Sequence, residues 1–173
     1  REPAGVFMHA SDLTRYIRQT HPEMTVYGAC YPECHPQSRD LDEDISWLKV
    51  KVDAGASHLI SQLFYDNADY LRFLDKARAA GIDVPIEAGI MPVTNAASVR
   101  RMTGMCSSKV PERLATILDR WGDDPNTLKE AGIIYASEQI ADLVARGVDG
   151  IHLYTMNHPG VTRRIWQNVR GLF

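Results

Sequence analysis

The sequence lacks several features that would assign it to particular classes of protein. It has no surplus of positive charge, because 19 lysines and arginines face 22 aspartates and glutamates. The chain therefore has no basic stripe that could bind a phosphate backbone, and nucleic-acid binding is not expected. No apolar run approaches the roughly 20 residues of a membrane-spanning helix, and the first residues do not resemble a secretory leader. We expect a cytoplasmic protein with no membrane partner.

Cysteine is also scarce, with Cys30, Cys34 and Cys106 as the full set. An odd number cannot pair internally without a remainder, so we expect free thiols. A metal site is not expected either. Cys30, Cys34 and His35 lie close in sequence, but structural zinc requires four ligands and Cys106 is the only other thiol.

What the sequence does contain is an alternation of two kinds of segment. Apolar runs without polar alternation are typical of strands buried on both faces, and they lie at residues 25–31, 58–64, 85–91 and 150–156. Helical patterns lie at residues 10–20, 43–54, 67–80, 96–106, 111–121, 125–146 and 161–169. Glycines at 55, 81 and 147 are typical of helix ends, where glycine adopts a left-handed conformation. The pattern predicts a parallel α/β fold.

Four strands are half of a closed (β/α)8 barrel of the TIM type. The first helical pattern, residues 10–20, has no strand before it. We therefore expect residues 1–173 to form the C-terminal four βα units of one barrel domain, without its N-terminal half. Half a barrel leaves two open sheet edges, so the chain should dock on a separate N-terminal segment or self-associate into a homo-oligomer.

Ligands of parallel α/β folds bind beyond the C-terminal ends of the strands. The loop after the first strand presents Tyr31, Glu33 and His35 between two prolines; on the residues alone, loop packing and ligand contact both remain open. Asp44 and Lys51 lie seven residues apart and so share one helix face. They suit the ribose and phosphate groups of a ligand, although a solvated face is the plainer interpretation.

The other three predicted strands also carry polar residues within them or at their ends. Gln62 is expected inside the second strand, where a side-chain amide loses stability if it has no partner; a structural amide and a ligand contact are equally favoured. The third strand ends in residues 89–95 and the fourth in residues 154–158. Both stretches mix small, polar and flexible apolar side chains, which can accommodate a flat aromatic ligand.

Four motifs in this order, YPECHP, KVKVDAGASHLISQLFYD, GIMPVTN and HLYTMN, resemble the second half of methylenetetrahydrofolate reductases. The resemblance extends over nearly the whole chain. It implies an eight-stranded β/α barrel that binds FAD. It also implies an oxidoreductase of one-carbon metabolism and methionine biosynthesis. Such an enzyme takes a hydride from NADH or NADPH and reduces 5,10-methylenetetrahydrofolate to 5-methyltetrahydrofolate.

The resemblance also implies roles for particular residues. The positions that contact the flavin cofactor are Tyr31, His35, Ser38, Asp44 and Lys51. The positions that contact the folate substrate are Gln62, Ser98, Met102 and His158.

The chain departs from the family pattern in several places. His158 stands where the family often has arginine, Met102 where some members have an aromatic residue, and Trp47 and Val50 where polar residues are frequent. The family's general-acid glutamate belongs to the N-terminal half. We therefore expect no catalytic residue in this chain and no reductase activity from it alone. A non-catalytic half-barrel that serves as a ligand-binding or assembly module is the alternative, and a different flavin- or pterin-using barrel is a third hypothesis.

Overall fold

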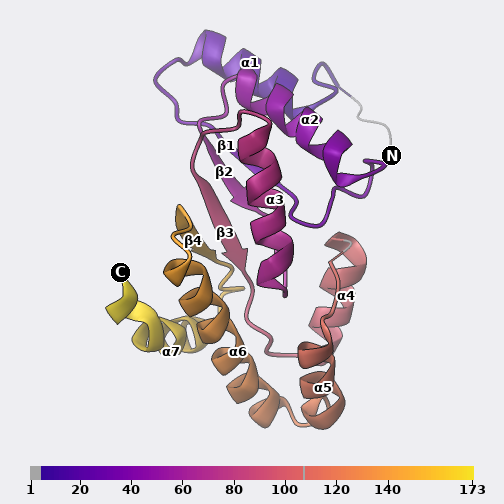
Figure 1. The fold of residues 1–173 in the computed structure, drawn as a ribbon, viewed down its shortest axis with the longest axis vertical. Helices are drawn as coiled ribbons and strands as arrows, with labels where there is room; N and C mark the ends of the chain where they lie inside the picture. Colours follow the sequence, from indigo (N-terminus) through magenta and orange to yellow (C-terminus); the bar gives the residue numbers. More distant parts are fainter. Residues whose placement is uncertain (1–4, 107) are drawn as a thin grey trace.

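A computed structural model describes residues 5–106 and 108–173. Its centre is a four-stranded, fully parallel sheet in the order β1-β2-β3-β4 (Figure 1). The strands are β1 (Tyr27–Cys30), β2 (His58–Ser61), β3 (Ile86–Ile90) and β4 (Gly150–Leu153). The helices are α1 (Ala10–Thr20), α2 (Leu41–Asp53), α3 (Asn67–Ala79), α4 (Ala96–Cys106), α5 (Glu112–Trp121), α6 (Pro125–Ala145) and α7 (Pro159–Val169), followed by the 3-10 turn η1 (Arg170–Leu172). The prediction of a parallel α/β fold is confirmed.

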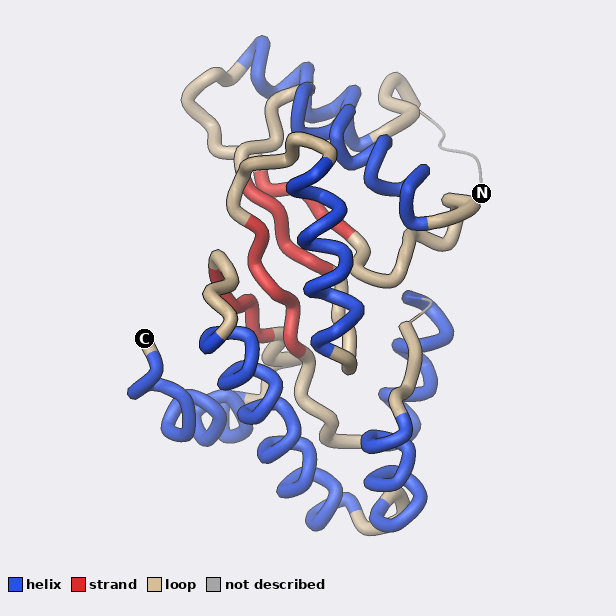
Figure 2. Tube along the Cα trace, in the orientation of Figure 1, coloured by secondary structure: helices blue, strands red, loops and turns tan. Residues whose placement is uncertain are grey.

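One face of the sheet packs against helices, as the trace in Figure 2 shows for α3. Side chains from α2, α3, α6 and α7 form a continuous core with residues on this face of the sheet. Among these strand residues, Leu59, Ile86 and Ile90 are fully buried. A second cluster lies around α4, α5 and α6 and includes Leu114 and Leu128. These apolar contacts fix the sheet against its helical layer.

The other face of the sheet carries a different set of side chains. The strand register places Tyr27, His58, Glu87 and His152 on this face. The rings of Tyr27 and His58 stack with centroids 4.7 Å apart. Nδ1 of His152 lies 3.5 Å from a carboxylate oxygen of Glu87. Tyr27 is exposed and the others are half-buried, so none of the described helices covers this face as it covers the first.

The helix ends follow the sequence pattern. Gly55, Gly81 and Gly147 have φ angles of +118°, +75° and +73°, which is the left-handed conformation expected after a helix. Asp124 caps α6, because its carboxylate accepts hydrogen bonds from the backbone N–H groups of Asn126 and Thr127. The three cysteines are free thiols, as expected.

The strands are shorter than predicted, and the difference lies mainly at their C-terminal ends. The expected second strand continues to residue 64, whereas β2 ends at Ser61. Leu63 and Phe64 are nevertheless buried, because the loop after the strand runs into the two apolar clusters. An apolar run therefore does not distinguish a strand from a buried loop. No helix in the described ranges is long and apolar enough to cross a membrane.

Candidate functional site

A cavity of about 430 Å³ lies where α1, β1 and α2 meet. Its walls come from the start of α1, the C-terminal end of β1, the following loop and one face of α2. The lining residues are Met8, His9, Ala10, Ser11, Ala29, Cys30, Tyr31, His35, Gln37, Ser38, Asp44, Trp47, Leu48 and Lys51. All five residues predicted to contact a cofactor are in this set. The structure thus brings together side chains that are up to twenty residues apart in sequence.

The start of α2 is set by its capping residue. Asp40 is extended, and its carboxylate accepts a hydrogen bond of 2.9 Å from the backbone N–H of Glu43, which satisfies one of the free donors of the first turn. From that start, positions 44, 48 and 51 fall on one side of the helix. Asp44 and Lys51 therefore both reach the cavity, with buried Leu48 between them.

Asp44 holds the loop that follows β1. Its carboxylate accepts hydrogen bonds from the backbone N–H of His35 at 2.9 Å and from the hydroxyl of Ser38 at 3.4 Å. Burial raises the pKa of Asp44 above its ordinary value, and the hydrogen bond from His35 acts in the opposite direction. The carboxylate thus fixes both loop residues against the cavity.

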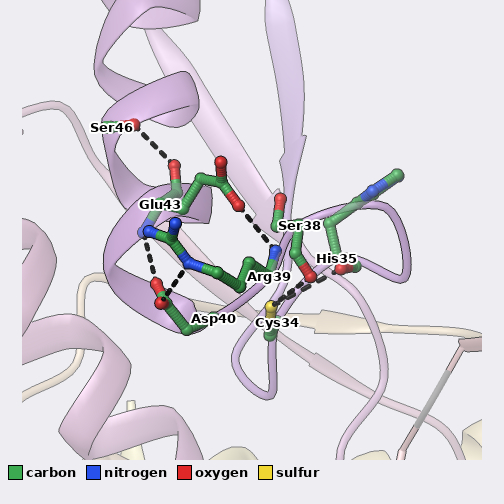
Figure 3. Close-up of polar contacts among 7 residues, drawn as sticks. All are labelled: Cys34, His35, Ser38, Arg39, Asp40, Glu43 and Ser46. Carbon is green, nitrogen blue, oxygen red and sulfur yellow. Dashed lines mark hydrogen bonds and ion pairs between the residues drawn. The ribbon is translucent and has the colours of Figure 1, made fainter.

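The loop itself is compact, as Figure 3 shows. Cys34 has a φ angle of +95°, a strained value for a residue with a side chain. Its Sγ lies 3.5 Å from the carbonyl oxygen of His35 and 3.8 Å from that of Ser38. The backbone N–H of Arg39 donates to the carboxylate of Glu43 at 2.6 Å. These contacts tie the loop to the first turn of α2.

Lys51 provides the cavity with a cation. Its Nζ donates a hydrogen bond of 2.6 Å to the carbonyl oxygen of Ala29 at the end of β1. Gly28 makes this approach possible, because a Cβ there would lie 3.0 Å from Cδ of Lys51. Burial lowers the pKa of Lys51, and the negative charge of Asp44 acts in the opposite direction. Burial also raises the pKa of Cys30 to about 12, so this neighbour remains a neutral thiol.

Tyr31 and Glu33 complete the description of this loop. The ring of Tyr31 meets the imidazole of His35 edge to face, with centroids 4.6 Å apart. One carboxylate oxygen of Glu33 accepts a 2.8 Å hydrogen bond from the backbone N–H of Lys109. The other is buried without a hydrogen-bond partner among the described residues. Burial raises the pKa of Glu33, and the bond from Lys109 acts in the opposite direction.

The predicted substrate residues lie elsewhere at the same end of the sheet. Gln62 follows β2 instead of lying within it, which corrects the expected position. Its backbone N–H still donates a hydrogen bond of 2.7 Å to the backbone carbonyl oxygen of Cys30 in β1. Its Oε1 accepts a hydrogen bond of 3.0 Å from the backbone N–H of Leu63. The side-chain oxygen therefore has the partner that burial demands.

The other three residues predicted to contact substrate come from two segments. Ser98 is in the first turn of α4 and Met102 lies further along it, packed against the second apolar cluster. His158 is exposed just before α7. None of the four substrate candidates lines this cavity or a second one of about 310 Å³ between α3, α5 and α6. Among the residues that the structure describes, no group of three or more histidine, cysteine or acidic side chains can hold a metal ion.

The sequence matches the family model described as methylenetetrahydrofolate reductase over residues 1–170. The chain belongs to the methylenetetrahydrofolate reductase family. It is 38% identical over 165 residues to methylenetetrahydrofolate reductase (NADH) 1 of Arabidopsis thaliana, a match that covers 88% of this chain and 28% of that protein. It is also 38% identical over 150 residues to the 5,10-methylenetetrahydrofolate reductase of Escherichia coli, covering 87% of this chain and 50% of that protein. The chain thus spans about half the length of this bacterial relative and about a quarter of the plant one.

A solved structure shares the fold. It is an uncharacterised protein from Clostridium thermocellum that binds two copies of 5-methyl-5,6,7,8-tetrahydrofolic acid. The two chains superpose with a TM-score of 0.60 over 94% of this chain and 58% of the other, at 16% sequence identity. At that identity the likeness establishes the arrangement of strands and helices.

Within this member of the reductase family, sequence reasoning missed part of the cavity wall. Trp47 lines it, although the sequence marked this residue only as a departure from the family pattern. Its position three residues after Asp44, on the same helix face, was a usable signal. Met8 and His9 also line the cavity. No local pattern identifies them, because their position depends on how α1 packs against α2.

Proposed function

We propose that this chain is the C-terminal half of a reductase barrel that binds a flavin. The complete protein would reduce 5,10-methylenetetrahydrofolate to 5-methyltetrahydrofolate, and this half would be inactive without its N-terminal complement. The observation that carries the proposal is the cavity between α1, β1 and α2, which gathers all five expected cofactor residues. Membership of the methylenetetrahydrofolate reductase family indicates the reaction, and the five residues are suited to bind a flavin for it.

The cavity fits the ADP portion of FAD. Its volume of about 430 Å³ falls within the range of about 300–1,000 Å³ that is usual for ligand pockets. Lys51 would hold the pyrophosphate by charge, and the N-terminus of α1, which contributes Ala10 and Ser11 to the wall, favours anions as well. Asp44 would accept hydrogen bonds from the ribose. Tyr31 and the loop residues His35 and Ser38 would orient the flavin, which would supply hydride transfer when bound.

The folate would lie at the C-terminal ends of β2, β3 and β4. Gln62 stands at the first of these ends with a side-chain amide that can pair with a pterin ring. Ser98, Met102 and His158 lie on segments that follow the other two strands. Folate binding by the fold neighbour from Clostridium thermocellum supports this assignment.

The general acid of the reaction would come from a second segment, which would also complete the barrel. In the described residues, β1 and β4 each pair with one strand only, and parallel strands of a barrel pair on both sides. The uncovered sheet face with Tyr27, His58, Glu87 and His152 would then line the barrel interior. Hydride transfer requires flavin, folate and a general acid in one arrangement, and this chain is proposed to hold only the first two.

A complementation assay tests the proposal. The purified chain would be mixed with a separately expressed N-terminal half of the Escherichia coli relative, and flavin absorbance would be followed with NADH or NADPH oxidation and methyltetrahydrofolate formation. We expect turnover in the mixture and none from either half. Flavin binding without turnover in the mixture would favour a ligand-binding module. A folded chain that binds no flavin in either condition would overturn the proposal.

A further inference from the structure

The backbone pairing of β2 with β3 stops early, beside the residue proposed to contact the pterin. Strands β1 and β2 pair over four residues, as do β3 and β4. In the described ranges, β2 and β3 pair over only two, and the second of these pairs is Ile60 with Glu87. Parallel strands normally continue with evenly spaced backbone hydrogen bonds. At Ser61, the next residue of β2, a side chain takes over the connection to β3.

Ser61 makes this connection with its hydroxyl group. The residue is fully buried. Its Oγ accepts a hydrogen bond of 2.8 Å from the backbone N–H of Gly89 in β3, and it donates one of 3.0 Å to the carbonyl oxygen of Gln62. In a regular parallel ladder, a backbone carbonyl of β2 would accept the bond from Gly89. The hydroxyl therefore leaves the carbonyl oxygen of Ser61 free to accept from another donor.

Tyr154, which follows β4, is that donor. Its hydroxyl donates a hydrogen bond of 2.9 Å to the carbonyl oxygen of Ser61, so the side chain crosses β3 to reach β2. Gly89 permits the crossing, because a Cβ there would lie 2.8 Å from Cε2 of Tyr154. Burial raises the pKa of Tyr154, which keeps the hydroxyl protonated. Three strands are thus joined at their C-terminal ends by side-chain hydrogen bonds.

The ring of Tyr154 is held in its direction by the uncovered sheet face. The imidazole of His152 meets the ring edge to face, with centroids 4.8 Å apart. Nδ1 of His152 in turn lies 3.5 Å from a carboxylate oxygen of Glu87. Aromatic packing of this kind restricts the rotation of both side chains. The Tyr154 hydroxyl is therefore directed at β2 by contacts that do not involve Gln62.

Gln62 is connected to the same network through its main chain and its side chain. Its carbonyl oxygen accepts from Ser61, and its N–H donates to the carbonyl oxygen of Cys30 at 2.7 Å. Its Oε1 accepts from the N–H of Leu63 at 3.0 Å. With Oε1 held in this way, the Nε2 amino group and the second lone pair of Oε1 are the groups that Gln62 can present to a ligand. Their direction depends on the position of Ser61.

We propose that Ser61 and Tyr154 are positioning residues for the folate substrate, which hold the loop after β2 so that the Gln62 amide faces the pterin. The inference rests on the proposed function, which places the pterin at Gln62. It adds two residues that act through Gln62. Loss of one hydrogen bond between uncharged groups corresponds to a change of roughly 2- to 10-fold in an equilibrium constant.

Tyr154→Phe tests the proposal, because it keeps the ring and removes the hydroxyl. Amide hydrogen exchange of the chain, followed by NMR, should show the Leu63 N–H exchanging roughly 2- to 10-fold faster than in the wild type, since the loop after β2 opens more often. The affinity for 5-methyltetrahydrofolate should fall by a similar factor. That affinity would be measured by calorimetry on the chain mixed with the N-terminal half of the Escherichia coli relative. FAD affinity should stay unchanged, and Ser61→Ala should give the same pattern.

Tyr70→Phe is the matched control. The hydroxyl of Tyr70 donates a hydrogen bond of 2.8 Å to the carbonyl oxygen of Ile86, the first residue of β3. The substitution removes the same kind of bond from the opposite end of the sheet. It should lower the midpoint of thermal unfolding without a selective change in Leu63 exchange and without a loss of 5-methyltetrahydrofolate affinity.

The outcomes separate this inference from the proposed function. Unchanged Leu63 exchange in Tyr154→Phe would overturn the inference, even with weaker folate binding, because Tyr154 would then contact the folate directly. Faster exchange with unchanged 5-methyltetrahydrofolate affinity would also overturn it, since the network would then serve the fold alone. A wild-type mixture that binds no 5-methyltetrahydrofolate would overturn the proposed folate site itself, and the inference with it.

Discussion

Replacing Lys51 by methionine should separate its role in ligand binding from its role in folding. The side chain donates one hydrogen bond, 2.6 Å long, to the carbonyl oxygen of Ala29. A hydrogen bond from a charged group contributes about 1.5–3 kcal/mol. In the free protein that gain is offset by desolvation, which lowers the pKa of Lys51. We therefore expect Lys51→Met to change the free energy of unfolding by no more than about 1 kcal/mol, because methionine keeps the apolar stem.

Ligand affinity should respond very differently. With a pyrophosphate in the cavity, the lost contact is charge-assisted and partly buried, so the same range of about 1.5–3 kcal/mol applies in full. This corresponds to roughly 10- to 150-fold weaker binding of ADP or FAD. Urea unfolding and calorimetric titration at low and high salt measure the two effects, and the salt dependence of affinity should also decrease.

Lys49→Met is the matched control on the same helix. Lys49 forms an ion pair with Asp53, whose side chain is 60% exposed, and such surface pairs contribute about 0–1 kcal/mol. Its removal should leave ligand affinity unchanged. The reasoning would be refuted if Lys51→Met destabilised the chain by more than about 3 kcal/mol while ADP and FAD bound as tightly as before.

Three further predictions concern packing, titration and capping. Gly89→Ala should cost at least about 1–3 kcal/mol in thermal unfolding, since the new Cβ would overlap the carbonyl oxygen of Ser61; an unchanged midpoint would contradict this packing. Burial raises the pKa of Glu33 in the folded chain above its pKa in the unfolded chain. The contribution of Glu33 to stability is therefore fully present below the unfolded pKa, where the side chain is protonated, and is lost as pH rises through the folded pKa. Glu33→Gln should remove that part of the decline in urea stability above about pH 4.5, and parallel curves for the two proteins would argue against it. Asp124→Ala should lower the midpoint of thermal unfolding by about 2–4 °C because it removes the cap of α6, and an unchanged midpoint would count against the cap.

The order of elements was predictable from the sequence because two independent signals agree. Apolar runs mark the strands, and glycines 55, 81 and 147 mark the helix ends before them. The ends of the strands were not predictable, since buried residues continue past the last residue that pairs with a neighbouring strand. Gln62 shows the effect, because it lies between Ser61 and buried Leu63 and was expected inside the strand.

The cavity was predictable in part for a similar reason. Asp44 and Lys51 share a helix face, and helical periodicity places them together. The loop residues were identified by resemblance to a family. His9 could not be found in either way, because it reaches the cavity only through the packing of α1 on α2, a tertiary contact with no local signature.

The strand order of the sheet has a consequence for how the chain is made. Each strand pairs with the one synthesised immediately before it, so β1-β2-β3-β4 is also the order in which they leave the ribosome. Each strand after β1 meets an edge that is already present. One helix connects β1 to β2 and β2 to β3, whereas α4, α5 and α6 all lie between β3 and β4. Assembly can therefore proceed vectorially, one βα unit at a time, without waiting for a distant segment.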